Sequence, residues 1–269
     1  MPHTRVIGLN LYYERAGSGP RLLLISGTGG DLRVTPNVFA SPLAKAFDLV
    51  AYDQRGLGRT DKPDAPYSMA QYADDAAALM DHLGWDDALV MGVSFGGMVA
   101  QELVLRHPSR VQRLALACTS PGGEGGASFA FHEIEHLKGE DRARFMIPIS
   151  DTRRDAAWAA ANPQDYATFV AMAAADPFAD EPGRAAGAHR QLEARAAHDT
   201  WDRLPRIACP VLIAAGQIDG IALPATQDKM AARIPGAELQ WFKGGHMFMV
   251  QDRAAYPAMI AFLNAAPSA

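Results

Sequence analysis

The most informative stretch of this chain reads Met91-Gly92-Val93-Ser94-Phe95-Gly96-Gly97. It places one serine between two glycines, directly after a short apolar run. With average glycine usage, about one chain in twenty with a similar number of serines contains such a pattern by chance. The motif alone therefore leaves two interpretations open, a nucleophile or a glycine-rich turn without chemistry. The nucleophile is the better interpretation only if the surrounding sequence supplies a strand, a helix and catalytic partners.

The flanking residues supply the strand and the helix. Residues 88–91 form a short apolar run, which is typical of a strand buried on both faces. Residues 95–106 have a helical pattern that ends before a proline. Gly92 and Gly96 would let a sharp turn close without Cβ clashes, and the helix N-terminus would favour a developing negative charge. We therefore predict that Ser94 is an exposed nucleophile on a strand-to-helix turn.

Similar elements extend along the rest of the chain. Apolar residues alternate with other residues over 5–13, and the stretch Gly17-Ser18-Gly19-Pro20 follows. This pattern predicts an opening strand pair with a turn. Residues 68–83 predict a helix with Ser68 as its N-cap. Short apolar runs that predict further buried strands occur at 22–25, 47–52, 114–117, 211–215 and 239–242. This alternation predicts an α/β fold, with a mostly parallel, doubly wound sheet and helices on both faces.

One long region interrupts the alternation of strands and helices. It begins Ser120-Pro121-Gly122-Gly123-Glu124-Gly125-Gly126 and continues with alanine-rich helical segments that contain no strand-like run. We expect residues 120–205 to form a helical cap, or lid, inserted into a core made of residues 1–119 and 206–269. The length of 269 residues, 49% of them hydrophobic, suits one domain with such an insertion.

Charge and composition argue against several classes of protein. The chain has 25 Lys and Arg against 30 Asp and Glu, a net charge of −5, and no block of like charge. We therefore expect neither nucleic acid nor a membrane surface as a partner. We also expect no signal peptide or membrane span, and hence a cytoplasmic location. Cys118 and Cys209 adjoin apolar runs and are interpreted as small buried residues rather than a disulfide.

Two residues downstream are the candidate partners of the serine. His246 lies in Gly244-Gly245-His246, directly after the last predicted strand, at the edge where open α/β sheets place their sites. Asp219 follows the predicted strand at 211–215. A histidine in an ordinary loop and an unrelated loop aspartate remain the alternatives. However, the chain order is Ser, Asp, His, with each residue after its own strand, and a serine nucleophile needs both a base and an acid that orients it.

The α/β-hydrolase superfamily uses this order, and the chain resembles that superfamily from about Val6 to Leu263. Within it the chain is similar to small esterases and lactonases of the 3-oxoadipate enol-lactonase and aclacinomycin-methylesterase-like kind. The resemblance implies a catalytic triad of Ser94, Asp219 and His246 that cleaves a small carboxylic ester or lactone through an acyl-enzyme. The scheme needs no metal or other cofactor, and no cluster with metal-ligand spacing is present in the sequence. The resemblance is carried by the motifs at 53–58, 92–97, 216–219 and 244–246.

The resemblance also implies an oxyanion hole made of two backbone N–H groups. One belongs to Phe95, and the other to Thr28 in the loop 26–31. The family often has a His-Gly pair in this loop, whereas this chain has Ser26-Gly27. Gly27 and Gly29 would let the backbone approach a substrate closely. The loop could also suggest nucleotide binding, but it lacks both the G-x-G-x-x-G spacing and a Gly-Lys-Ser/Thr ending.

We expect the cap to select the substrate. Several apolar residues could line a substrate pocket, but each could instead serve only in packing. Several arginines could bind a substrate carboxylate, but each could instead lie on a solvated helix face. The candidates for the pocket are Phe129, Phe145, Met146, Trp158 and Met247, and the arginines are Arg142, Arg144, Arg153 and Arg154.

Two further functions share the same residues. A cofactor-free perhydrolase or carbon–carbon bond hydrolase could use this triad, and so could a ligand receptor that retains the triad without turnover. The sequence does not separate these functions, and it leaves open the acyl and alcohol groups, a preference for ester or lactone, the lactone ring size and the oligomeric state.

Overall fold

The computed structural model describes residues 3–266, which contain an eight-stranded sheet in the order β1-β2-β4-β3-β5-β6-β7-β8. Strands β3 to β8 are parallel to one another, whereas β2 pairs antiparallel with both β1 and β4. The predicted mostly parallel sheet is therefore confirmed. The strands are β1 (His3–Val6), β2 (Leu9–Ala16), β3 (Arg21–Ile25), β4 (Asp48–Tyr52), β5 (Ala88–Val93), β6 (Val111–Ala117), β7 (Val211–Gly216) and β8 (Glu238–Phe242).

The predicted opening turn was misplaced. The β1–β2 hairpin turns at Ile7 and Gly8, which both have positive φ, 47° and 77°. The residues 17–20 instead join β2 to β3, and these strands are not neighbours because β4 lies between them. A β-branched residue rarely adopts positive φ, so local sequence gave no signal for a turn at Ile7.

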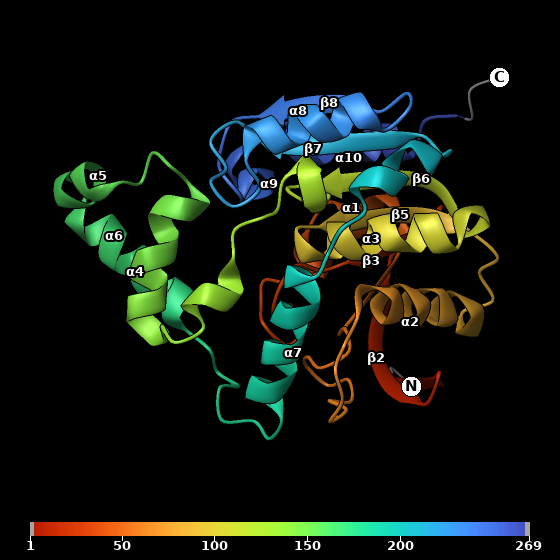
Figure 1. The fold of residues 1–269 in the computed structure, drawn as a ribbon, viewed down its shortest axis with the longest axis horizontal. Helices are drawn as coiled ribbons and strands as arrows, with labels where there is room; N and C mark the ends of the chain where they lie inside the picture. The colour runs from red at the N-terminus through yellow and green to blue at the C-terminus, as the bar shows by residue number, and fades with distance from the viewer. Residues whose placement is uncertain (1–2, 267–269) are drawn as a thin grey trace.

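The sheet is covered by helices on both faces (Figure 1). Helices α2 (Met69–His82), α3 (Phe95–Arg106) and α8 (Pro224–Arg233) cover one face, and an apolar layer that contains Tyr72, Val99 and Met230 fills the space beneath them. The opposite layer contains Leu43 and Met259, below α1 (Leu43–Ala46), α9 (Phe248–Gln251) and α10 (Ala255–Leu263). The predicted burial of both strand faces was wrong for β8, an edge strand whose Trp241 is 36% exposed.

The helix α2 begins where the sequence predicts. The Ser68 hydroxyl accepts a hydrogen bond from the backbone N–H of Gln71, and this serine is the N-cap. Short 3-10 helices occupy Val38–Ala40, Pro108–Arg110, Gly123–Gly125, Phe131–Ile134 and Trp201–Arg206. No helix between residues 3 and 266 combines the length and the apolar character needed to cross a membrane.

Four helices lie between β6 and β7, the region predicted to be a cap. They are α4 (Gly139–Ser150), α5 (Ala156–Ala161), α6 (Pro163–Ala174) and α7 (Arg184–Ala196). Figure 1 shows α4, α5 and α6 grouped beyond one edge of the sheet, whereas α7 lies nearer to the core. The apolar cluster between α4 and α6 has only three buried members, Ala143, Ile147 and Val170.

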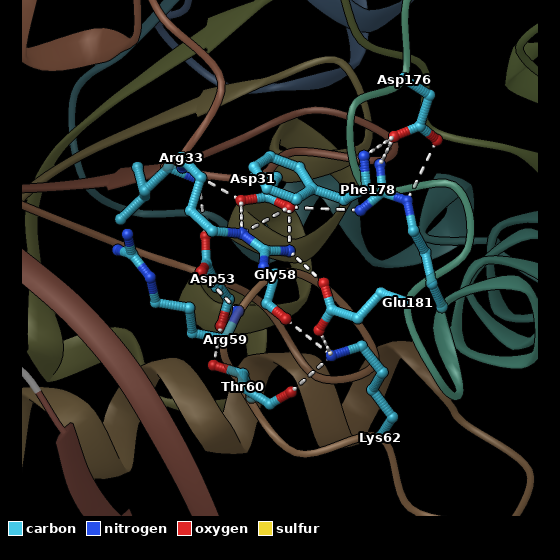
Figure 2. Close-up of polar contacts among 12 residues, drawn as sticks. Asp31, Arg33, Asp53, Gly58, Arg59, Thr60, Lys62, Asp176, Phe178 and Glu181 are labelled. Atoms are coloured by element: carbon cyan, nitrogen blue, oxygen red, sulfur yellow. Dashed lines mark hydrogen bonds and ion pairs between the residues drawn. The ribbon is translucent and has the colours of Figure 1, made fainter.

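Ion pairs join the segment before α7 to two loops of the core (Figure 2). We call Asp31, Arg33, Lys62, Asp176, Glu181 and Arg184 the cap ion network. Glu181 Oε2 lies 2.6 Å from Arg33 Nη2, and its other oxygen lies 3.2 Å from Lys62 Nζ. Asp31 pairs with both Arg33 and Arg184, and its side chain is fully buried. Burial opposes ionisation of Asp31, but the hydrogen bonds and charge of Arg33 hold its pKa below the usual value.

The loop that contains the motif Asp53–Gly58 supports the same region. Asp53 accepts hydrogen bonds from the backbone N–H groups of Leu32, at 2.7 Å, and Arg59, at 2.9 Å. Burial raises the pKa of Asp53 to about 6. A Cβ at Gly58 would overlap the Asp53 carboxylate. The motif therefore fixes the loop after β4 against the loop after β3.

Candidate active site

Ser94 lies on a strained turn between β5 and α3. Its backbone has φ 54° and ψ −115°, a conformation that costs a non-glycine residue about 1–3 kcal/mol. The surroundings maintain it, because the Ser94 N–H donates to Ala117 O at 2.8 Å and the Thr119 hydroxyl donates to Ser94 O at 2.7 Å. A Cβ at Gly96 would overlap the carbonyl oxygen of Ile25, so only glycine fits there. Ser94 is only 7% exposed, so the predicted exposure of this serine was wrong, because the loop at Gly27 and the His246 side chain lie against it.

His246 and Asp219 complete a chain of hydrogen bonds with Ser94. His246 Nε2 lies 2.9 Å from Ser94 Oγ, and His246 Nδ1 lies 2.8 Å from Asp219 Oδ2. The side chains of Asp219 and His246 are 1% and 12% exposed. With the Nδ1 proton donated to Asp219, Nε2 is the free acceptor that a general base requires. The three residues follow β5, β7 and β8, as the sequence predicts, at the carboxyl edge of the sheet.

Backbone groups orient the acid and the base. The other Asp219 oxygen, Oδ1, accepts the N–H groups of Ile221 at 2.7 Å and Ala222 at 3.0 Å. The backbone N–H of His246 donates to Ser150 O, at the end of α4, at 2.7 Å. Both carboxylate oxygens of Asp219 are therefore hydrogen-bonded, and the loop that carries His246 is attached to the end of α4.

The expected oxyanion donors lie on the loop after β3 and at the start of α3, which approach each other at Ser94. A Cβ built on Gly27 would lie 3.5 Å from Ser94 Cβ, which brings the loop after β3 against the nucleophile. Within residues 3–266 the backbone N–H groups of Thr28 and Phe95 have no hydrogen-bond acceptor. Phe95 is the first residue of α3, where an N–H has no partner inside the helix. Both N–H groups are therefore available to a ligand oxygen.

Two residues of α7, which the sequence analysis missed, contact this loop. Gln191 Oε1 accepts the Gly29 N–H at 2.9 Å, and Arg195 Nη1 donates to Thr28 Oγ1 at 2.7 Å. Gln191 is fully buried, and Arg195 is 6% exposed. The only available signal was their i, i+4 spacing, which places them on one helix face. In a polar, alanine-rich helix that spacing is usual for solvated residues.

One cavity is lined partly by the loop 26–31, and another is lined by Arg195, whose side chain contacts that loop. The larger, about 430 Å³, is mainly apolar and is lined by Gly27, Val93, Met247 and Tyr256 among others. The smaller, about 80 Å³, is lined by Met98, Phe129, Arg195 and His198 among others. Burial lowers the pKa of His198 to about 4, so this imidazole is neutral at pH 7.

The apolar residues predicted to bind substrate lie in different places. Met247 borders the larger cavity, and Phe129 borders the smaller. Phe145 is 42% exposed, with its ring centroid 6.1 Å from that of Phe129. Trp158 packs against Phe169 within the cap, and Met146 is partly buried on α4. The structure thus places Met247 and Phe129 at the two cavities, and their role in binding stays a prediction.

Comparison with known proteins identifies relatives of this chain. A family model described as the alpha/beta hydrolase fold matches residues 20–252, most of the chain. A protein of Azorhizobium caulinodans whose name is that of a carbamate hydrolase, RutD, is 30% identical over 92% of both chains. The 3-oxoadipate enol-lactonase 2 of Acinetobacter baylyi is 28% identical over 93% of this chain and 90% of its own.

A solved structure resembles the chain over its whole length. The enol-lactonase of Burkholderia xenovorans LB400 superposes with a TM-score of 0.79 and 27% identity, covering 98% of this chain and 100% of that one. Its similarity, like that of the Acinetobacter protein, supports the resemblance to lactonases. The family match and the arrangement of the sheet together establish that this chain belongs to the alpha/beta hydrolase fold family and is a hydrolase.

Proposed function

We propose that this hydrolase cleaves a carboxylic ester or lactone through an acyl-enzyme formed on Ser94. The hydrogen-bonded chain from Ser94 through His246 to Asp219, with distances of 2.9 and 2.8 Å, carries the proposal. A serine hydroxyl is a weak nucleophile unless a base removes its proton during attack, and this chain provides such a base and its orienting acid.

In the acylation step, Ser94 Oγ attacks the substrate carbonyl carbon while its proton moves to His246 Nε2. Asp219 stabilises the imidazolium that forms. The backbone N–H groups of Thr28 and Phe95 donate to the oxyanion of the tetrahedral intermediate, and each such donor is worth about 10²- to 10³-fold in rate. His246 then protonates the leaving alkoxide, which breaks the carbonyl–oxygen bond.

Deacylation repeats these steps with water as the nucleophile. His246 takes a proton from water as it attacks the acyl carbon, and then returns the proton to Ser94 Oγ. For a lactone the leaving alkoxide remains attached to the acyl group, so the product is one hydroxy acid. The larger cavity beside Gly27 and Met247 would hold an apolar portion of the substrate. We also propose residues 120–205 as the cap and residues 1–119 with 206–269 as the catalytic core.

A substrate panel tests this function. It comprises p-nitrophenyl esters from acetate to octanoate, γ- and δ-lactones, and a phenyl carbamate, which tests the activity in the name of the Azorhizobium relative. We expect saturable turnover of an ester or lactone that fluorophosphonate abolishes. Turnover of the carbamate alone would contradict the proposed substrate class. Rapid perhydrolysis or β-diketone cleavage without ester turnover would favour the alternative chemistries, and a serine adduct without any turnover would favour a receptor.

A further inference from the structure

Arg195 is the least exposed arginine among residues 3–266, and none of them supplies it with a carboxylate. Its guanidinium donates to two hydroxyls, Thr28 Oγ1 at 2.7 Å and Ser128 Oγ. It also stacks on Phe131, with the central carbon 4.4 Å from the ring centroid. Arginine has five N–H donors, so donors remain beyond these two contacts.

A buried cation without a counter-ion needs an explanation. Arg55, which is almost as buried, donates from Nη2 and Nε to the two oxygens of the Asp75 carboxylate, at 2.7 and 2.9 Å. That pairing is the usual arrangement, because removing a charge from water without a partner costs several kcal/mol. Burial accordingly lowers the pKa of Arg195 to about 10, which still leaves the guanidinium charged at pH 7.

Arg195 lies beside both a cavity and an expected oxyanion donor. It borders the smaller cavity, and its Nη1 contacts the side chain of Thr28, the residue whose backbone N–H is the expected oxyanion donor. His198 borders the same cavity, and its buried Nε2 has no hydrogen-bond partner within the described part of the chain. The cavity of about 80 Å³ exceeds the roughly 10–15 Å³ that one water requires. It therefore offers space and polar groups for a small anionic substituent.

We infer that Arg195 binds a carboxylate carried by the substrate, at a short distance from the ester carbonyl. This inference rests on the proposed hydrolase function and specifies the substrate class as an ester with a free carboxylate on its acyl or alcohol part. The planar guanidinium suits the two oxygens of a carboxylate. Arg195 is the one arginine or lysine that lines this cavity among the described residues, and a single guanidinium in a cavity of this size suits one negative charge better than the two of a phosphate monoester.

The kinetic test compares two substrates that differ in charge and little in size. They are the mono-p-nitrophenyl ester of glutaric acid and its methyl-capped diester. We expect the wild-type protein to prefer the anionic ester, by the ratio of the two kcat/KM values. Arg195→Gln should reduce that ratio about tenfold or more, because it removes charge-assisted hydrogen bonds. Arg195→Lys should retain part of the ratio, since it keeps the charge without the planar fork.

Arg203→Gln is the matched control. Arg203 pairs with Glu102, with Nη1 2.6 Å from Oε2, and it borders neither cavity, so the same loss of charge should leave the ratio unchanged. An equal fall of the ratio in both variants would show a general electrostatic effect and overturn the site. An Arg195→Gln variant that slows both esters equally would show that Arg195 acts only through Thr28, which also overturns it.

A binding measurement separates failure of this inference from failure of the hydrolase proposal. In the Ser94→Ala protein, glutarate should raise the midpoint of thermal unfolding, uncharged glutaramide should not, and addition of Arg195→Gln should remove the effect. If this result holds while no ester is cleaved, the carboxylate site stands and the hydrolase proposal fails. If esters are cleaved but glutarate has no effect on either protein, the hydrolase proposal stands and the carboxylate site is wrong.

Discussion

The proposed catalytic core and the proposed cap differ in what holds their residues in place. Ser94, Asp219 and His246 each follow a strand of a sheet that two apolar layers enclose. In contrast, the apolar cluster between α4 and α6 has three buried members, and polar contacts at Ser150, Gln191 and the cap ion network attach the cap to the core. We therefore expect the sheet to fix the geometry of the proposed triad, and substitutions in most of the proposed cap to disturb that geometry little.

The two regions meet at the loop 26–31, which holds the expected oxyanion donor Thr28. Thr28 and Gly29 belong to the core, but the side chains that contact them, Arg195 and Gln191, come from α7 of the cap. Substitutions in α7 should therefore affect catalysis, unlike those elsewhere in the cap. The following predictions test this difference, from the largest expected effect to the smallest.

Ser94→Ala should have the largest effect, because it removes the nucleophile. We expect kcat/KM for the best ester to fall about 10⁴- to 10⁶-fold. The midpoint of thermal unfolding should stay close to that of the wild type or rise slightly, because the substitution removes no contact that the fold requires. Steady-state assays with thermal unfolding of the same preparation check both values. A residual rate near that of the wild type would exclude Ser94 as the nucleophile.

His198→Gln should change the pH dependence of the protein's stability. His198 lies just after α7, where the chain returns from the proposed cap to the core. The pKa of His198 is depressed from 6.5 to about 4 by burial, so between these values the unfolded chain binds a proton that the native chain does not. The free energy of unfolding should therefore rise with pH in this window, by up to about 1.4 kcal/mol per pH unit from this group. Stability from His198 is complete above pH 6.5 and is lost as the pH falls toward 4.

Urea unfolding at several values between pH 4 and 6.5 tests this. The variant should show a smaller slope than the wild type, whatever its absolute stability. Parallel curves for the two proteins would mean that His198 is not kept neutral by the fold.

Gln191→Leu should lower activity through the position of the oxyanion loop. The substitution leaves the Gly29 N–H without its acceptor, a loss worth about 1–3 kcal/mol. We expect kcat on an uncharged ester to fall roughly tenfold with little change in KM, because the oxyanion forms only in the transition state. Gln164→Leu, on the exposed face of α6, is the matched control from the rest of the cap. Equal rates for the two variants would remove the distinction between α7 and the other cap helices.

Glu181→Gln should have the smallest effect, on stability alone. Glu181 pairs with Arg33 and Lys62 at a partly exposed position, so neutralising it should cost about 0.5–1 kcal/mol of unfolding free energy. The difference from wild type should shrink in 1 M salt, because salt screens such pairs. A loss that is as large in high salt as in low salt would show that packing, not charge, connects this segment to the core.

The sequence predicts the core better than the cap for a physical reason. Strands buried on both faces require short apolar runs, so β3 to β7 can be located from local sequence, and Ser94, Asp219 and His246 can be identified because each follows such a run. The exposed edge strand β8 and the turn at Ile7 depend on neighbours in the sheet, which local sequence does not encode.

The contacts of the cap depend on how its helices dock. Gln191 and Arg195 lie among alanines and charged residues, and only the position of α7 against the oxyanion loop buries them. Trp158 has the aromatic character of a pocket residue, yet it packs against Phe169 because α5 and α6 contact each other. Residue type alone therefore could not distinguish substrate contacts from packing within the cap.

The most direct test of the triad is the intact mass of the protein after incubation with a fluorophosphonate, followed by peptide mapping. The wild-type protein should gain one adduct, located on Ser94, and Ser94→Ala should gain none. Absence of an adduct from the wild type, or an adduct that persists in Ser94→Ala, would contradict the assignment of Ser94 as a nucleophile activated by His246 and Asp219.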